Sequence, residues 1–418
     1  MKILYTIGIY LYAFLLKLVS PVHPKAKLWV DGRKGVFQKL ENSLKTNQNP
    51  VIWMHVSSLG EFEQGRPLIE QIKQKYPEYK IVLTFFSPSG YEIRKDYPLA
   101  DVVVYLPIDT PRNAKRFLNL VKPKKIFFVK YDFWYHYLSE AHRRNIPTYL
   151  ISALFRENQL FFKPYGRFYR KILHFFTTMF VQDKNSVELL NSVGYNKAII
   201  AGDTRVDRVA DLAEQVQPIP YIDDLKQDAL LLIAGSTWQP DEELLLSFFK
   251  KYHTSLPVKL IVAPHEIDHA HVEQLSKMFK DASISHIRYS SLSENTKVED
   301  YVALIIDSIG LLSSLYQYGD IAYIGGGFGA GIHNTLEPAT FGLPIIFGEK
   351  YHKFNEAVSL VALKGAFSIN QLSELEEIGK KLLTDSGFRE KSGNVAKAFI
   401  SSQKGAVDIV ISYCFSEK

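Results

Sequence analysis

Short apolar runs recur along the chain, and longer segments with helical periodicity separate them. This alternation is typical of a parallel β-sheet covered by helices. In the first half, the runs expected to form strands are residues 51–56, 80–85, 101–106, 125–129, 148–152, 178–182 and 198–202. In the second half they are residues 230–235, 258–264, 302–307, 321–326 and 344–348. The pattern predicts an α/β protein with two doubly wound sheets.

A polar segment with two prolines and no clear period, residues 213–228, separates the two halves and predicts a linker. A chain of 418 residues is also too long for one ordinary hydrophobic core. We therefore expect two Rossmann-like domains, residues 21–212 and 229–385, that face each other across a cleft. A C-terminal helical segment, residues 386–418, is expected to pack back on the first domain.

The first twenty residues differ from the rest, because no charge occurs from Ile3 to Leu16. The run is short for a full bilayer span, but Lys17 could extend its side chain to the membrane surface. A signal peptide is one alternative, although no small-residue cleavage site follows, and a buried amphipathic helix is another. Several basic residues follow: Lys25, Lys27, Arg33, Lys34 and Lys39. The sequence predicts a membrane anchor, residues 1–20, that spans or dips into the bilayer and leaves the body cytoplasmic.

Composition and charge limit the classes of partner that the protein is expected to bind. A hydrophobic content of 46% and a charged content of 22% are those of a globular protein. The net charge of +6 is spread without a Lys/Arg block, so an anionic membrane surface or substrate is expected, and no nucleic acid. The single Cys414 excludes an internal disulfide. His265, His269 and His271 lie close in sequence but lack the H-E-x-x-H spacing, and no D-x-D pair occurs, so we expect no metal.

Ligands of such folds sit at the carboxyl ends of the strands. The segment "GGGFGAGIHNTLEPATFG", residues 325–342, follows a strand and precedes a short predicted helix. Backbone N–H groups of Gly326 and Gly327 are expected to approach a phosphate there. Glu337, one helical turn from Asn334, is expected to bind a ribose. A dinucleotide fingerprint remains an alternative, formed by Gly325, Gly327 and Ala330, with Glu349 as the ribose-binding acid.

Other polar groups also follow strands. In "HVSSLGE", Glu61 begins a helix, where a carboxylate is favoured in the ionised state that a general base needs; merely complementing the helix dipole is the alternative. Lys130 and Asp132 share a face of an extended segment, where they are a catalytic pair or a salt bridge. Arg205 is expected to face the cleft, and Ser236 is expected to touch a ligand or cap a helix.

These loops, in this order, resemble those of the Kdo transferases of lipopolysaccharide assembly, which are inverting glycosyltransferases of the two-Rossmann GT-B type. The motifs that carry the resemblance cover nearly the whole chain: "HVSSLGE", "LTFFSPSG", "YLPIDTPRNAKRFL", "AGDTRVD", "AGSTWQPDEE", "DSIGLLSSLY" and "IGGGFGAGIHNTLEPA". The resemblance implies transfer of 3-deoxy-D-manno-octulosonic acid (Kdo) from CMP-Kdo to a lipid A precursor, lipid IV-A. It also implies a location at the cytoplasmic face of the inner membrane and no cofactor or metal.

The resemblance also implies roles for single residues. Glu61 matches the family's general base, and Arg205 takes the place of a lysine that stabilises the transition state. The residues matched to CMP contacts are Pro264, His265, Ile309, Gly310, Leu311, Asn334, Thr335, Leu336 and Glu337. The chain departs from the family at Lys130, which replaces an acid, at His265, which replaces an arginine, and at Leu311 and Lys353.

Three alternatives to Kdo transfer remain open from the sequence. The first is another nucleotide-sugar enzyme of the same fold, such as a UDP-sugar transferase or epimerase. The second is an NAD-binding oxidoreductase that uses the dinucleotide fingerprint. The third is a catalytically silent lipid-surface binding protein, which the departures at Lys130 and His265 would suit.

Overall fold

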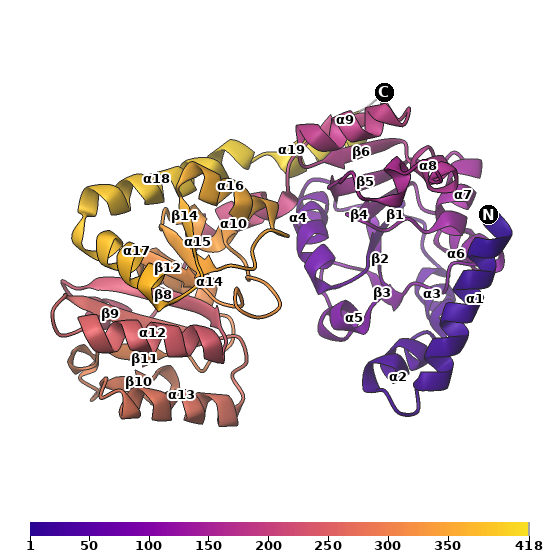
Figure 1. Cartoon of the computed structure of the whole chain (residues 1–418). Coiled ribbons are helices and arrows are strands. Elements are labelled where there is room, and N and C mark those ends of the chain that lie inside the picture. Colours follow the sequence, from indigo (N-terminus) through magenta and orange to yellow (C-terminus); the bar gives the residue numbers. More distant parts are fainter. Residues whose placement is uncertain (417–418) are drawn as a thin grey trace. The chain divides into compact units, whose positions relative to one another are not determined.

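The chain folds into two compact α/β units. The computed structural model describes residues 1–416 (Figure 1). One unit comprises Met1–Asp207 together with the C-terminal residues from Gly405 onward, and the other comprises Arg208–Lys404. Each unit contains a seven-stranded sheet in which all paired neighbours are parallel. The predicted α/β class with two doubly wound sheets is confirmed.

The first sheet has the strand order β3-β2-β1-β4-β5-β6-β7. Its strands are β1 (Val51–Val56), β2 (Lys80–Phe85), β3 (Val102–Tyr105), β4 (Lys125–Val129), β5 (Thr148–Ala153), β6 (Thr178–Val181) and β7 (Ala198–Ile200). Strand order reverses at β1, which lies between β2 and β4. In open parallel sheets the crevice at such a switch point is the usual ligand site. The loops after β1 and β4 therefore hold the leading candidate residues of this unit.

Helices cover both faces of the first sheet, and alternate residues of β1 pack toward opposite faces. Trp53 belongs to one buried cluster and Met54 to the other. The helices are α1 (Lys2–Val19), α2 (Pro24–Asp31), α3 (Val36–Leu44), α4 (Leu59–Lys75), α5 (Pro88–Arg94), α6 (Pro111–Val121), α7 (Tyr135–Arg143), the 3-10 helix η1 (Leu160–Phe162), α8 (Arg167–Leu173), α9 (Lys184–Ser192) and the C-terminal α19 (Ala406–Phe415). Val410 and Ile411 of α19 are buried in the same cluster as Met54.

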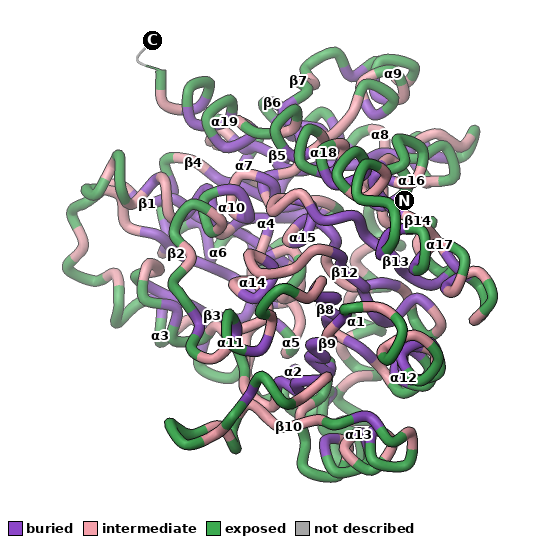
Figure 2. Tube along the Cα trace, turned by 90° about the vertical axis from the view of Figure 1, so that its left-hand side faces the viewer, coloured by how far each residue is buried: buried purple, intermediate pink, exposed green. Residues whose placement is uncertain are grey.

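The second sheet has the order β10-β11-β9-β8-β12-β13-β14. Its strands are β8 (Leu230–Thr237), β9 (Val258–Pro264), β10 (His286–Arg288), β11 (Ala303–Ile305), β12 (Ile321–Ile324), β13 (Ile345–Gly348) and β14 (Ala366–Ile369). The central strands β8, β9 and β12 are mostly buried, as the purple trace in Figure 2 shows. The sequence did not predict β10 and β14, because these short edge strands are only partly buried and have no continuous apolar run.

The second sheet also carries helices on both faces. They are α11 (Ile222–Lys226), α12 (Gln239–Tyr252), α13 (His269–Asp281), α14 (Leu312–Leu315), α15 (Leu336–Thr340), α16 (Asn355–Leu363), α17 (Leu372–Thr384) and α18 (Ser386–Gln403), with the 3-10 helices η2 (Tyr289–Ser291), η3 (Val298–Asp300) and η4 (Tyr316–Tyr318). Helix α10 (Thr204–Glu214) contains the boundary between the units. Within the expected linker 213–228, Ile222 and Leu225 of α11 are fully buried.

The N-terminal helix α1 has two different faces. It is long and apolar enough to cross a membrane by length and composition, and none of its residues is buried. One face docks on the first unit: the Tyr5 hydroxyl donates to Asp109 at 2.6 Å, and Thr6 Oγ1 lies 2.9 Å from His136 Nε2. The other face is apolar and exposed, with Ile3 at 74% and Leu18 at 59%. A helix that is apolar on its outer face suits contact with lipid.

Candidate functional site

In the first unit, the turn after β1 places Glu61 at the start of α4. Ser58 caps this helix with extended backbone, and the Ser58 hydroxyl donates to the Glu61 carboxylate. Glu61 is the only acidic residue in the first turn of α4. The N-terminus of a helix favours a negative charge through its unpaired N–H groups and the helix dipole. The prediction that Glu61 lies at the start of a helix is therefore confirmed.

The turn after β4 brings Asp132 beside this loop. The Ser57 hydroxyl donates to Asp132 Oδ1 at 2.5 Å, and Asp132 Oδ2 lies 3.4 Å from His55 Nε2. Burial raises the pKa of Asp132 to about 8; the hydrogen bond from Ser57 opposes the rise, and the charge of Glu61 adds to it. Asp132 therefore carries a proton at neutral pH, which makes it chemically different from Glu61 nearby.

His55 is held as a neutral imidazole in the floor of this site. It is fully buried, and burial lowers its pKa to about 3. The Trp134 indole donates to His55 Nε2 at 2.9 Å, while His55 Nδ1 lies 2.8 Å from Thr84 Oγ1. Because the indole N–H already occupies the Nε2 lone pair, that nitrogen is an acceptor and carries no proton. The sequence did not single out His55 and Trp134, since both lie within or just after apolar runs.

The sequence had suggested that Lys130 and Asp132 share a face of an extended segment, but the backbone is not extended there. Lys130 has φ = 63°, a left-handed conformation that turns the chain immediately after β4. Asp132 instead contacts Ser57 and His55. A non-glycine residue in this conformation is strained, and such strain is concentrated at functional sites.

Arg205 is fixed by a carboxylate of its own loop. Its Nη2 donates to Asp203 Oδ2 at 2.7 Å, and the Gln64 side-chain amide donates to Asp203 Oδ1 at 3.1 Å. Burial alone would raise the pKa of Asp203, but the charge and the hydrogen bonds of Arg205, and then the charge of Lys130, outweigh it and leave the pKa lowered. The pair is therefore ionised, with Arg205 positioned as a cation.

In the second unit, packing within the protein accounts for the glycine-rich loop after β12. A Cβ on Gly325 would lie 2.3 Å from the Ser236 carbonyl oxygen, and one on Gly327 would lie 2.5 Å from the Gly348 nitrogen. Gly326 has φ = 89°, which favours glycine. The backbones of β8 and β13 thus leave no room for a side chain at Gly325 or Gly327.

The Gly326 N–H is also engaged inside the fold. It donates to Asp241 Oδ2 at 2.9 Å, and the Tyr323 hydroxyl donates to Asp241 Oδ1 at 2.8 Å. Asp241 is buried and also accepts from the Trp238 N–H at 3.0 Å, so it joins α12 to the loop. The expected phosphate contact from the Gly326 N–H therefore has a competitor in Asp241.

An aromatic cluster lies beside this loop. The His265 and His333 rings stack with centroids 4.2 Å apart, and the Trp238 and His265 centroids are 4.9 Å apart. The Trp238 indole donates to His333 Nε2 at 3.1 Å. Burial, and then the neighbouring His265, lower the pKa of His333 to about 4, so His333 is neutral. Sequence analysis selected His265 but missed Trp238 and His333, whose contacts depend on the fold.

The remaining candidates follow strands of the same sheet. Asn334 Nδ2 donates to Glu337 Oε1 at 2.9 Å, and Asn334 Oδ1 accepts from the Leu336 N–H at 3.0 Å, just before α15. Thr335 is fully buried. Pro264 ends β9, and Ser236 has φ = 55° near the end of β8. The segment 309–311 precedes α14, with Gly310 at φ = 93° and Ile309 90% exposed.

The structure also addresses metal binding for the described part of the chain. Within residues 1–416, no group of three or more His, Cys, Asp or Glu side chains is arranged to hold a metal ion. Of the histidines clustered in sequence, His271 pairs with Glu242 at 3.0 Å, and His265 stacks on His333.

Two parallel doubly wound sheets, each with polar loops at its switch point, define a protein of the GT-B class. The UDP-GlcNAc 2-epimerase from Neisseria meningitidis bound to UDP-GlcNAc has the same fold, with a TM-score of 0.61 and 16% identity over 88% of this chain and 100% of that one. The fold alone does not separate transferases from epimerases.

Sequence comparisons identify the family. The model of the 3-deoxy-D-manno-octulosonic-acid transferase family matches residues 31–208. The 3-deoxy-D-manno-octulosonic acid transferase of Haemophilus influenzae is 30% identical over 378 residues, which cover 85% of this chain and 84% of that protein. The Aquifex aeolicus transferase is 28% identical over 365 residues, covering 84% and 93%. The chain belongs to the Kdo transferase family of glycosyltransferases, and the resemblance noted in the sequence is confirmed.

Proposed function

We propose that this protein transfers Kdo from CMP-Kdo to a lipid A precursor, lipid IV-A, and releases CMP. The observation that carries the proposal is that the loops after β1 and β4 bring Glu61 close enough for its charge to raise the pKa of Asp132, at the switch point of the first sheet, in a chain that belongs to the Kdo transferase family. The reaction needs a base for the acceptor hydroxyl, a site for the nucleotide and cations for the leaving phosphate.

Glu61 is the proposed general base. It removes the proton from a glucosamine 6-hydroxyl while the oxygen attacks the anomeric carbon of Kdo, and the bond from that carbon to the CMP phosphate breaks. Because Asp132 holds its proton at neutral pH, it adds no second negative charge beside Glu61. A positioned base supplies about 10²–10⁴-fold in rate. Attack from the face opposite the phosphate inverts the anomeric centre.

The cations have a separate role. Arg205, fixed by Asp203, and Lys130 offset the charge that develops on the departing phosphate. The leaving group is a nucleoside monophosphate, so we propose that neither a bridging metal nor a cofactor is required. The nucleotide is assigned to the second unit, where the Asn334–Glu337 segment binds the ribose and residues 264–265 and 309–311 complete the contacts, together with Ser236 and Gly327.

We also propose that the protein works at the cytoplasmic face of the inner membrane. The support is α1, whose outer face is apolar and exposed, and the basic residues that follow it. An anionic membrane surface and the lipid acceptor are the proposed partners, and nucleic acid is not among them.

The test is a transfer assay with the purified full-length protein in neutral detergent. CMP release and the mass of the lipid acceptor are followed with CMP-Kdo and lipid IV-A, with and without a chelator. We expect acceptor-dependent CMP release, an acceptor heavier by Kdo, and no effect of the chelator. Calorimetric titration with CMP, UDP and NAD serves as the specificity control. Release of CMP without a glycosylated lipid, or tighter binding of UDP or NAD, would contradict the proposal.

A further inference from the structure

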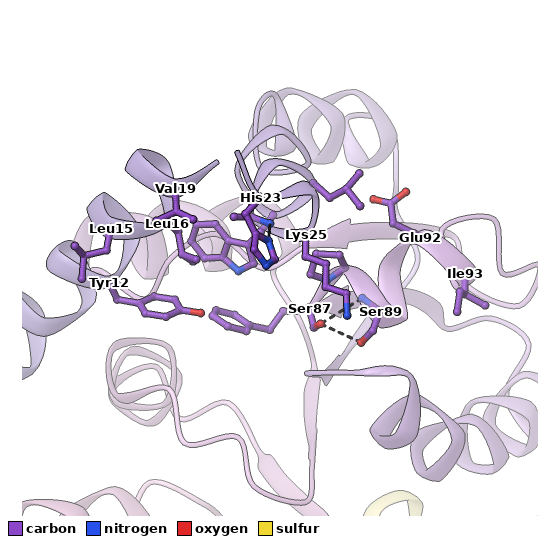
Figure 3. Close-up of a pocket in the computed structure, with 15 residues that line it drawn as sticks. Tyr12, Leu15, Leu16, Val19, His23, Lys25, Ser87, Ser89, Glu92 and Ile93 are labelled. Carbon is purple, nitrogen blue, oxygen red and sulfur yellow. Dashed lines mark hydrogen bonds between the residues drawn. The ribbon is translucent and has the colours of Figure 1, made fainter. Parts of the chain in front are cut away.

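An apolar groove of about 880 Å³ opens in the first unit (Figure 3). Its walls come from three segments: α1 contributes Leu15 and Val19, α2 contributes Trp29, and the segment from β2 into α5 contributes Phe86 and Ile93. Volumes of about 300–1,000 Å³ are typical of pockets that bind small ligands. The groove is therefore large enough for a ligand, and its lining is suited to hydrocarbon.

Contacts behind the lining hold the walls of the groove together. The Arg33 guanidinium lies 3.7 Å over the Trp29 ring and donates to the carbonyl oxygens of Phe86 at 2.8 Å and Leu106 at 2.9 Å. Tyr12 of α1 meets the edge of Trp29, with centroids 5.8 Å apart. These contacts join α1, α2 and the β2–α5 segment, so the groove is formed before any ligand enters.

The groove is directly connected to the loop of the proposed base. The Phe86 N–H donates to the Val56 carbonyl at 3.2 Å, and the Ser87 N–H donates to the Ser57 carbonyl at 2.7 Å. Ser57 in turn binds Asp132, and the next residue binds Glu61. All of these residues belong to the first unit. Two backbone hydrogen bonds therefore link the lining of the groove to the loop that carries Glu61.

The mouth of the groove is continuous with the exposed face of α1. Leu15 and Val19 line the groove and are also exposed, and Ile93 on the opposite wall is 58% exposed. His23 and Lys25 stand at the edge, where Figure 3 shows them between α1 and the Ser87–Ser89 turn. Lys25 supplies a cation to the lining, and the carboxylate of the lining, Glu92, is paired with Lys95 at 3.6 Å, so the apolar walls and Lys25 together suit a lipid that has an anionic headgroup.

We propose that this groove binds one acyl chain of the acceptor lipid and thereby selects acylated acceptors. The proposal rests on the proposed function and deepens it, because the chain in the groove would hold the sugar hydroxyl near Glu61. The proposed ligand is the acyl chain of the acceptor, and phospholipid of the surrounding membrane is its competitor.

Two variants that obstruct the groove in different ways test whether it selects acylated acceptors. Ile93→Glu places a charge in the wall, and Ser89→Trp fills the groove with a ring; both positions are exposed, so the fold should tolerate them. Leu18→Glu, on the exposed part of α1 outside the groove lining, is the matched control. The acceptor is supplied in neutral detergent, either fully acylated or stripped of its ester-linked chains.

We expect both groove variants to lower kcat/KM for the acylated acceptor by about 10- to 100-fold, as losing contact with two or three methylene groups implies. Their kcat/KM for the stripped acceptor should stay within about twofold of wild type. The Leu18→Glu control should weaken binding to vesicles of anionic phospholipid and keep acyl selectivity. Equal losses on both acceptors, or lost vesicle binding with retained acyl selectivity in Ile93→Glu, would overturn the proposal.

A binding measurement separates this proposal from the transferase proposal. An acceptor with brominated acyl chains should quench tryptophan fluorescence mainly through Trp29, which lines the groove, so Trp29→Phe should remove most of the quenching and leave the weaker part from Trp134, which packs behind Phe86 with centroids 4.6 Å apart. Quenching without turnover would retain the acyl site and reject Kdo transfer. Turnover without quenching of Trp29 would retain the transferase and reject the acyl site.

Discussion

The substitution Asp132→Asn tests whether a proton is stored beside the proposed base. Asparagine has the shape of the protonated carboxyl. Its oxygen can accept from the Ser57 hydroxyl, and its amide can point toward His55 Nε2, which already accepts from Trp134. The variant should therefore fold like the wild type, and what it removes is the capacity to ionise.

The magnitude follows from the pKa of Asp132, which burial raises from 3.8 to about 8. Below pH 3.8 both the folded and the unfolded chain hold the proton, so the group favours neither state. Between pH 3.8 and about 8 only the folded chain holds the proton, so ionisation increasingly favours the unfolded chain and the free energy of unfolding falls as the pH rises. One pKa unit corresponds to about 1.4 kcal/mol, so this loss reaches at most about 4 kcal/mol at neutral pH.

The asparagine variant has no such loss, so its stability advantage over wild type should increase with pH. Between about pH 5 and about pH 7 the difference in unfolding free energy should widen by up to about 3 kcal/mol. Denaturant titration followed by tryptophan fluorescence suits the measurement, because Trp29, Trp53 and Trp134 belong to the first unit.

A stability difference that does not change with pH would refute the protonated carboxyl and leave Asp132 an ordinary ionised acid. A second comparison checks the cause. Because the charge of Glu61 contributes to the raised pKa, Glu61→Gln should lower the pKa of Asp132 and move the end of the pH-dependent range downward.

Three further predictions concern the base, the nucleotide and the anchor. Glu61→Gln should lower kcat by at least about 10²-fold and leave the CMP affinity measured by calorimetry unchanged. Near-normal turnover would mean that Glu61 only complements the helix dipole, and the substitution would then cost about 0.3–1 kcal/mol of unfolding free energy. Glu337→Gln should weaken CMP binding by about 10- to 100-fold, whereas the control Glu349→Gln should not; the reverse result would move the ribose to Glu349. Tyr5→Phe should cost about 1.5–3 kcal/mol of unfolding free energy, because Asp109 loses a hydrogen-bond donor. Ile7→Asp, on the exposed face of α1, should reduce partition into the membrane without that cost. Equal stability of the two variants would show that α1 is not docked on the first unit.

The sequence predicted the central strands because strands buried on both faces appear as continuous apolar runs, as in "VIWMHV" at β1. It also placed Glu61 correctly at the start of a helix, since that position depends on a local turn. It could not predict the contact of Asp132 with His55, because that contact depends on β1 pairing with β4. Local patterns determined the elements, and the order of the strands determined the site.

The glycine-rich loop shows that a motif suggestive of ligand binding can also be required by packing inside the fold. The N–H groups of Gly326 and Gly327 were expected to approach a phosphate, but close packing alone already excludes a side chain at Gly325, beside the Ser236 backbone, and at Gly327, beside the Gly348 backbone. The N–H of Gly326 is likewise used by Asp241. Glycine at these positions is therefore required by the fold whether or not a nucleotide binds.

The inner face of α1 is tied to the elements that carry the candidate residues of the first unit. If α1 were only an anchor, nothing would require its inner face to contact the fold, and a flexible tether would serve. Instead Tyr5 supplies a hydrogen bond to Asp109, which also accepts from the backbone N–H groups of His136 and Tyr137 at the start of α7. The loop that carries Asp132 runs directly into this helix, so the position of α1 is coupled to the loop beside Glu61. With α1 in the membrane position proposed above, this docking would fix the height of the proposed base relative to the bilayer that holds the acceptor lipid.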